Sequence, residues 1–197
     1  YTDPTGGLEA FRDQPAPNFI LITDVHADHL STTTIASVIG ADTILIVPKA
    51  VSDVLPPELA SRARVLNNDE GTTIKGLEVM AFPMYNLSDS ADNKYPRGRG
   101  NAYMLNRDGF NIYIAGDTSD TPEMRELKNI DIAFIPMNPP FTMSVDEAVD
   151  AVLAFKPKQV YPFHYRGANG LEDINRFKNL VEQADKSIDI VMLNWYK

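Results

Sequence analysis

The chain contains only three histidines, His26, His29 and His164, and two of them fall in one short acidic segment. That segment, Thr23-Asp-Val-His-Ala-Asp-His29, follows a short run of apolar residues. Neutral imidazoles and carboxylates are the usual protein ligands of zinc and of neighbouring first-row metals. Polar residues crowded after a hydrophobic strand fit a site at the end of that strand better than a packing role.

The spacing inside the segment is compatible with metal binding. Residues two apart in an extended chain project to the same side, so Asp24, His26 and Asp28 can line one face. A turn at Ala27–His29 would let His29 join them from the other direction. The alternative is a pair of surface histidines beside solvated acids. With Asp28 between the histidines, we favour the metal site.

The composition limits which residue types can bind a metal and which classes of molecule the protein can bind. The sequence has no cysteine, so disulfides, thiolate metal sites and a cysteine nucleophile are excluded, and a metal must be held by His, Asp or Glu. The net charge is −9, and the tight basic cluster of Lys94, Arg97 and Arg99 is too short to follow a nucleic-acid groove. No apolar run approaches the ~18 residues of a membrane span. We therefore expect a small-molecule substrate and neither nucleic acid nor membrane as partner, in the cytoplasm or the periplasm.

The apolar patterning alternates strands with helices along the whole chain. Strands are predicted at 19–22, 43–47, 72–75, 77–82, 102–106, 110–115, 130–135, 160–163 and 188–193. Helices are predicted at 32–38, around 49–55, at 145–155 after the capping box Ser144-Val-Asp-Glu147, and from 171 to about 184. Residues 86–99 are predicted to form a loop. This order predicts an α/β fold in a single domain over residues 1–197, with sheet layers sandwiched by helices.

Three motifs resemble those of the metallo-β-lactamase superfamily. Asp24-Val-His-Ala-Asp-His29 resembles its H-x-H-x-D-H signature, with Asp in the first place. Ala115-Gly-Asp-Thr118 resembles the family's G-D-T/S turn, whose Asp bridges two metals, and Tyr161-Pro-Phe-His-Tyr165 resembles the segment with its closing strand-end His. The resemblance implies a four-layer αββα sandwich and a metal-dependent hydrolase.

Further stretches resemble one branch of that superfamily, the L-ascorbate-6-phosphate lactonase-like proteins. These stretches are Met84–Asn86, Pro96–Asn101, Thr121–Met124, Ile130–Pro136 and Phe141–Met143. The resemblance runs from about Asp3-Pro4 to the end of the chain. It is specific for the fold and nearly silent on the substrate.

The resemblance implies metal ligands at two sites of unequal strength. The implied ligands are Asp24, His26, Asp28, His29, Asp117 and His164. The site of Asp28, His29, Asp117 and His164 is intact, whereas Asp24 and Tyr95 stand where relatives carry two of the histidines of the other site. We expect a divalent ion, Zn²⁺ first with Mn²⁺ or Fe²⁺ as alternatives, bound tightly at the intact site and weakly at the second.

The first residues of the sequence bear on which strands of the sandwich are present. The sequence opens on Tyr1, and family members usually have strands before the Asp3-Pro4 segment. We expect the first N-terminal strands of the sandwich to be missing from this chain. Since an unpaired sheet edge readily adds a partner strand, a homodimer or pairing with the missing segment is expected.

The implied reaction is hydrolysis by a metal-bound hydroxide of an ester, lactone, amide or phosphodiester. Asp28 is expected to ligate the ion and orient the hydroxide, while Tyr95 or a metal-bound water protonates the leaving group. Candidates for substrate contact are Asn86, Arg97, Arg99, Tyr165 and Arg166. A guanidinium can clamp a carboxylate or phosphate with a bidentate fork, although solvated loop charges are the commoner case.

Two other functions compete with hydrolysis. One is a single-iron oxidoreductase on the same fold, of the persulfide-dioxygenase kind, because this ligand set suits iron as well as zinc. The other is a non-catalytic metal-binding module, suggested by the substitutions at Asp24 and Tyr95. Fold alone does not choose among them.

Overall fold

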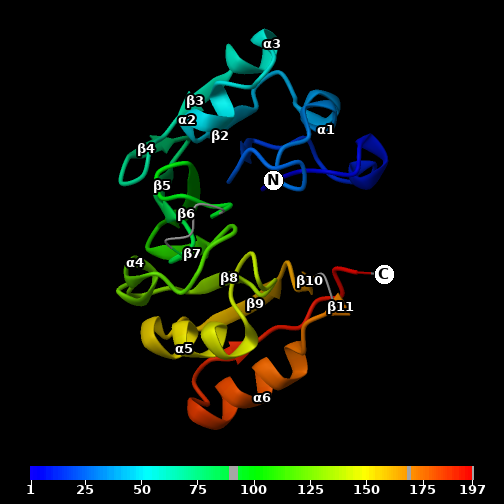
Figure 1. The fold of residues 1–197 in the computed structure, drawn as a ribbon. Coiled ribbons are helices and arrows are strands. Elements are labelled where there is room, and N and C mark those ends of the chain that lie inside the picture. The colour runs from blue at the N-terminus through cyan, green and yellow to red at the C-terminus, as the bar shows by residue number, and fades with distance from the viewer. Residues whose placement is uncertain (89–92, 168–169, 197) are drawn as a thin grey trace.

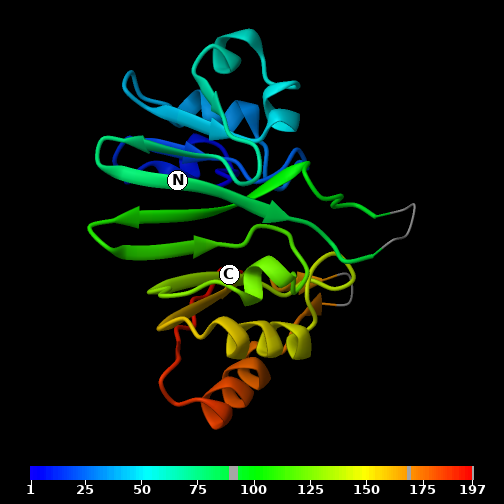
Figure 2. The same cartoon turned by 90° about the vertical axis from the view of Figure 1, so that its left-hand side faces the viewer.

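The computed structural model describes residues 1–88, 93–167 and 170–196, and it arranges them around two β-sheets with helices on either side (Figure 1). In the view of Figure 2, α2 (Lys49–Ser52) and α3 (Pro57–Ala60) lie at the top, and α5 (Val145–Phe155) and α6 (Ile174–Ala184) lie at the bottom. Among the described residues, no helix is long and apolar enough to cross a membrane.

The first sheet is parallel and has three strands in the order β1-β2-β3. Its strands are β1 (Phe19–Leu21), β2 (Ile44–Val47) and β3 (Ala63–Val65). Thr2 forms an isolated parallel bridge with Leu21 of β1. The accompanying helices are the short 3-10 helix η1 (Leu8–Phe11), α1 (Thr32–Val38), α2 (Lys49–Ser52) and α3 (Pro57–Ala60).

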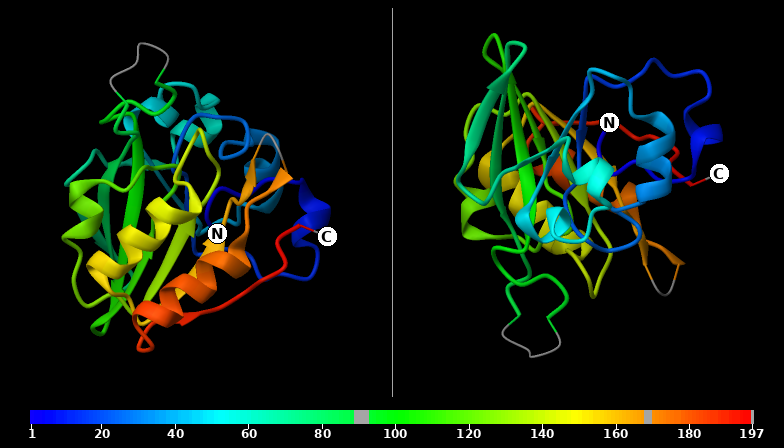
Figure 3. Two further views of the ribbon diagram at one scale, coloured as in Figure 1. Left: turned by 60° about the horizontal axis from the view of Figure 1, so that its bottom comes forward. Right: turned by 90° about the horizontal axis from the view of Figure 1, so that it is seen from above.

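The second sheet is mixed and has seven strands in the order β12-β9-β8-β7-β6-β5-β4. Its strands are β4 (Gly71–Ile74), β5 (Leu77–Met84), β6 (Gly100–Arg107), β7 (Phe110–Ile114), β8 (Ile132–Pro136), β9 (Gln159–Phe163) and β12 (Asp189–Ile190). Strands β4 to β7 are antiparallel, whereas β7, β8, β9 and β12 run parallel. The helices α4 (Pro122–Arg125), α5 (Val145–Phe155) and α6 (Ile174–Ala184) connect the strands of its parallel part. A hairpin of β10 (Arg166–Gly167) and β11 (Gly170–Leu171) precedes α6. Figure 3 shows α5 and α6 side by side over this sheet.

Three clusters of buried apolar side chains fill the spaces between the layers. Successive side chains of a strand point to opposite faces, so Ile20 and Leu45 pack with α1 and α2 in one cluster while Leu21 and Ile46 pack in another. That second cluster also contains Val79, Ala81 and Tyr103 of the seven-stranded sheet, so it joins the two sheets. The third joins the seven-stranded sheet to α4, α5 and α6. The predicted four-layer αββα architecture is confirmed.

Most predicted elements are present, and the differences have local causes. Helix α6 begins at Ile174 and not at 171, because Asp173 is its N-cap and accepts a hydrogen bond from the backbone of Arg176. Strand β3 was not predicted, since three residues are too few to show a pattern. The capping box at Ser144 is formed as predicted. Of the predicted loop 86–99, residues 89–92 lie outside the described part.

Strand direction explains why polar segments distant in sequence meet. Strands β7, β8 and β9 are parallel, so their C-terminal ends share one edge of the sheet. Because β6 is antiparallel to both β5 and β7, its start and the end of β5 lie at that edge too. The segments after β5, β7 and β9 and the loop before β6 therefore converge.

Candidate metal centre

The segment after β1 turns back on itself. The backbone amides of His29 and Leu30 both donate to the carbonyl of His26, at 3.0 and 2.8 Å. This turn is the one predicted at Ala27–His29. It directs the imidazole of His29 inward, where the side chain is buried, and leaves Asp28 partly exposed.

Asp117 reaches the same place from the end of β7. The preceding Gly116 has φ of 62°, and a Cβ there would collide with Met84 Sδ and lie 3.2 Å from Thr23 Cβ. Glycine therefore lets the chain turn under the site without a side chain. The carboxylate of Asp117 is fully buried.

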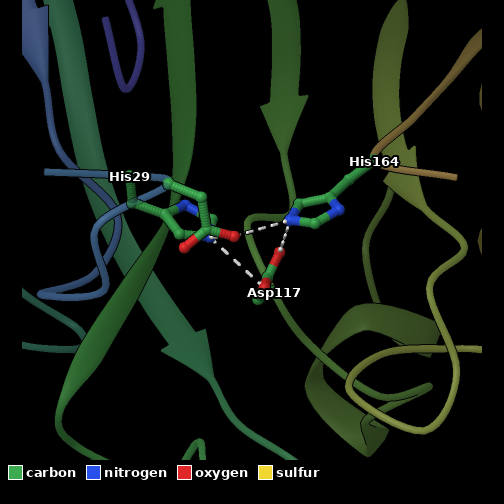
Figure 4. A group of neighbouring side chains, drawn as sticks. His29, Asp117 and His164 are labelled. Carbon is green, nitrogen blue, oxygen red and sulfur yellow. Dashed lines mark hydrogen bonds and ion pairs between the residues drawn. The ribbon is translucent and has the colours of Figure 1, made fainter. Parts of the chain in front are cut away.

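His164 follows β9 and completes the group. Its φ is 47°, in the left-handed region that non-glycine residues adopt at a cost of about 1–3 kcal/mol and that is common at functional sites. Figure 4 shows the His164 and His29 side chains on either side of Asp117. Asp117 contacts both imidazoles, and His164 also contacts the carboxylate of Asp28. We call Asp28, His29, Asp117 and His164 the four-ligand cluster.

The spacing within the cluster matches that of metal ligands. His29 Nε2 lies 3.3 Å from Asp117 Oδ2 and 3.7 Å from Asp28 Oδ2. His164 Nε2 lies 3.3 Å from Asp28 Oδ2 and 3.5 Å from Asp117 Oδ1. Tetrahedral bonds of 2.0–2.1 Å place neighbouring ligand atoms about 3.3–3.4 Å apart. The contacts, which involve both oxygens of Asp117, are close to this separation, so the four side chains can surround one small divalent ion.

Two buried atoms of the cluster lack other partners. Among the described residues, His29 Nε2 and Asp117 Oδ1 are buried without a hydrogen-bond partner. Buried polar atoms are nearly always satisfied, because an unsatisfied one costs about 1–3 kcal/mol. Both atoms are metal donors and both belong to the cluster. The residues therefore fit a metal ion on structural grounds.

A second set of side chains orients the two imidazoles. His29 Nδ1 contacts Asp3 Oδ2 and Thr23 Oγ1, both at 2.9 Å. His164 Nδ1 contacts the Asn138 side-chain amide at 3.1 Å. In each ring Nδ1 is engaged and Nε2 faces the cluster, and at His29 the partner of Nδ1 is a carboxylate, as is usual for metal-binding histidines. These orienting residues were not identified from the sequence, where no local signal marks them.

The charges of the cluster shift its pKa values in one consistent way. The hydrogen bond from His164 holds the pKa of Asp28 well below its usual value. Burial alone would raise the pKa of Asp117, but the nearby His29 imidazole lowers it overall. Burial alone would lower the pKa of His29, yet Asp117 and Asp3 raise it to about 11. The pKa of His164 is likewise raised, by Asp28 and Asp117 against burial. The acids are thus ionised at neutral pH, and an incoming ion displaces protons from the imidazoles.

The other implied ligands lie beside the cluster and not in it. Asp24 is fully buried, and each of its carboxylate oxygens accepts a hydrogen bond from the guanidinium of Arg99. His26 Nδ1 lies 3.2 Å from Asp24 Oδ2. Tyr95 is buried and donates its hydroxyl to Asp117 Oδ2 at 2.6 Å. Of the six implied metal ligands, the structure brings four together.

The predicted substrate-contact residues are scattered. Asn86 donates to the carbonyl of Phe141, and Arg97 forms an ion pair with Glu123 at 2.6 Å. Tyr165 is buried and donates to the carbonyl of Leu193. The structure does not bring these three to the cluster.

Arg166 is placed differently. It lines a cavity of about 550 Å³ that also reaches Asp28, His29 and His164. Its guanidinium lies 4.2 Å from the ring centre of Tyr196, which lines the same cavity. The remaining walls include Ile114, Phe134, Phe163 and Trp195. The cluster therefore opens on a mainly apolar cavity.

Comparisons with known proteins identify the family of the chain. The model of the β-lactamase superfamily domain matches residues 1–164. The chain is 32% identical over 182 residues to a metal-dependent hydrolase of Pyrococcus furiosus, covering 89% of this chain and 79% of that protein. Its fold is similar to the crystal structure of a candidate metal-dependent hydrolase from Parabacteroides distasonis, with a TM-score of 0.84, 37% identity, and 97% and 82% of the two chains covered. A metallo hydrolase from Ignicoccus hospitalis shares the fold at 20% identity, with a TM-score of 0.78 and 99% and 84% covered.

Proposed function

The chain belongs to the metallo-β-lactamase superfamily and is a metal-dependent hydrolase, and from this premise we propose that one divalent ion in the four-ligand cluster supports hydrolysis of a small-molecule ester, lactone, amide or phosphodiester. The observation that carries the proposal is the pair of buried metal donors, His29 Nε2 and Asp117 Oδ1, which have no hydrogen-bond partner among the described residues. Two imidazoles and two carboxylates suit Zn²⁺, Mn²⁺ and Fe²⁺, with Zn²⁺ as our first expectation.

A divalent ion held by these four side chains would take a water as a further ligand, lower the pKa of that water and polarise the substrate oxygen. The remaining work falls to the protein. Asp28 is the most exposed member of the cluster and is ionised at neutral pH. We assign it to orient the attacking water, accept its proton and pass that proton to the leaving group.

Tyr95 acts on the site through Asp117. Its hydroxyl donates a hydrogen bond to Asp117 Oδ2, and burial together with that carboxylate raises the pKa of the phenol above its usual value. The phenol therefore stays protonated and fixes the plane of the carboxylate. We assign Tyr95 this positioning role, so that the leaving group receives its proton from Asp28.

The cavity beside the cluster indicates the kind of substrate. Its walls are mainly apolar and aromatic, and Arg166 is the one lysine or arginine among its described lining residues. We propose a substrate with an apolar body and at most one anionic group, which Arg166 would contact. A polyanion such as nucleic acid is disfavoured by the net charge of −9.

The test combines metal analysis with a substrate panel. The wild type should contain about one equivalent of Zn, Mn or Fe and hydrolyse at least one lactone, ester, amide or phosphodiester. His164→Ala should lose most of both, because it removes one of four ligands. His26→Ala is the matched control and should keep its metal, since His26 lies outside the cluster. A wild type that takes up none of these metals would refute the proposal.

A further inference from the structure

We propose that the guanidinium of Arg99 stands in for a second metal ion, so that this enzyme works with a single ion. The inference rests on the proposed function for the four-ligand cluster and concerns the residues beside it: Asp24, His26, Tyr95 and Arg99. The sequence led us to expect a weak second metal at Asp24 and His26. The contacts of these residues indicate that a cation of the protein already holds that place.

The pairing of Arg99 with Asp24 uses both carboxylate oxygens. Arg99 Nε lies 3.1 Å from Asp24 Oδ1, and Nη2 lies 2.7 Å from Oδ2. The Asp24 carboxylate is fully buried, and its Oδ1 also accepts the backbone amide of Val25 at 2.8 Å. A bidentate guanidinium–carboxylate pair is one of the strong charge-assisted contacts in proteins. A metal at Asp24 would first have to break it.

His26 is engaged on both ring nitrogens. Its Nδ1 lies 3.2 Å from Asp24 Oδ2, and its Nε2 lies 3.4 Å from Arg99 Nη2. The guanidinium therefore sits against the same two side chains that a second ion would bind. An ion placed there would also be repelled by the positive charge of Arg99.

Tyr95 closes the remaining approach. Its hydroxyl donates to Asp117 Oδ2, the carboxylate that would otherwise bridge two ions. Its ring meets His26 edge-on, with centroids 5.0 Å apart, and the Arg99 guanidinium lies 5.4 Å from the ring centre. The phenol is therefore engaged as a hydrogen-bond donor to this carboxylate. The Asp24 carboxylate and the Tyr95 hydroxyl thus have hydrogen-bond partners within the protein without a metal.

Asp24 and Arg99 complement each other in charge. Asp24 is an anion at the position where the family signature has a neutral imidazole. Arg99, which lies 75 positions further along the chain, supplies the positive charge that balances it. A buried anion without a partner is strongly unfavourable. The pair is therefore expected to depend on both members, and removing the cation should leave a buried acidic group beside His26 that can accept an added ion.

The experiment measures metal stoichiometry and affinity in four proteins: wild type, Arg99→Met, Arg99→Lys and Arg97→Met. Each is titrated with Zn²⁺ against a competing chelator and then analysed by mass spectrometry after desalting. Arg97→Met is the matched control, because Arg97 lies in the same loop but pairs with Glu123. Circular dichroism confirms folding before each titration.

We expect one equivalent in wild type, in Arg97→Met and in Arg99→Lys, which keeps a cation. Arg99→Met should bind a second, weaker equivalent. Two tight equivalents in wild type, or no second equivalent in folded Arg99→Met, would overturn the inference. If Arg99→Met does not fold, the wild-type and Arg99→Lys stoichiometries still decide. A wild type without any bound metal would instead refute the proposed function, so the two failures are distinguishable.

Discussion

Replacing Asp3 with Asn is expected to weaken metal binding although Asp3 is not itself a ligand. Asp3 Oδ1 accepts the backbone amide of Thr23 at 2.8 Å, and Oδ2 accepts the hydroxyl of Thr23 at 2.6 Å and contacts His29 Nδ1 at 2.9 Å. Asp3 has φ of 45°, a conformation that Asn also tolerates. The substitution therefore changes the hydrogen bonding and charge with little backbone strain.

The expected loss follows from the His29 tautomer. If the Asn oxygen stays on the Thr23 amide, its NH₂ group faces His29 Nδ1. That nitrogen then becomes the acceptor and the ring proton moves to Nε2, the atom that must bind the ion. Changes to such orienting partners typically reduce metal affinity 10- to 100-fold. This range corresponds to about 1.4–2.7 kcal/mol, and we expect the upper end because the charge is lost as well.

The assay is a Zn²⁺ titration against a competing chelator at fixed pH and ionic strength. Asp42→Asn is the control, because it removes the same charge from an exposed residue outside the site. The control should bind Zn²⁺ like the wild type. A folded Asp3→Asn protein with an affinity within about twofold of wild type would show that Asp3 does not set the tautomer of His29.

Three other outcomes are expected. Because the pKa of His29 is raised from 6.5 to about 11, its stabilisation of the metal-free protein is full below pH 6.5 and is lost as the pH rises towards 11. Metal affinity should rise with pH over that window, with proton release detectable by calorimetry in buffers of different ionisation enthalpy; a pH-independent affinity would contradict this. Gly116→Ala should lower the metal affinity more than tenfold, because the added Cβ would collide with Met84. The control Gly109→Ala has open space around the added Cβ and should lower only the stability of the protein. Equal metal affinity in both variants would contradict the role of Gly116. Ser144→Ala should lower the free energy of unfolding by about 1 kcal/mol in denaturant titrations, with metal binding unchanged; an unaltered unfolding midpoint would show that the capping box contributes nothing.

The four-ligand cluster could be predicted because each of its motifs is local. Asp28 and His29 follow a short apolar strand, and Asp117 and His164 each follow another strand, so polar residues after an apolar segment indicate the strand end. Strands β7 and β9 lie in the parallel part of the seven-stranded sheet, so the ends that precede Asp117 and His164 share one edge, and the segment after β1 reaches them from the three-stranded sheet. The sequence alone does not state which strands are neighbours, and the resemblance to a known family supplied that.

Contacts between segments with no local pattern could not be predicted. Asp3 orients His29 from 26 residues away, and nothing around Asp3 distinguishes it from another acid. Arg99 was predicted as a possible substrate clamp, yet it contacts Asp24, 75 residues away, because the start of β6 lies beside the segment after β1. Charge complementarity between two loop residues becomes evident only when strand order fixes their distance.

The most direct test is a crystal structure of the Zn²⁺-loaded protein with diffraction data collected on both sides of the zinc absorption edge. The account predicts a single anomalous peak about 2.0–2.2 Å from His29 Nε2, from His164 Nε2 and from a carboxylate oxygen of Asp117, with Asp28 completing the coordination. A strong peak between Asp24 and His26, or no peak within the four-ligand cluster, would contradict it.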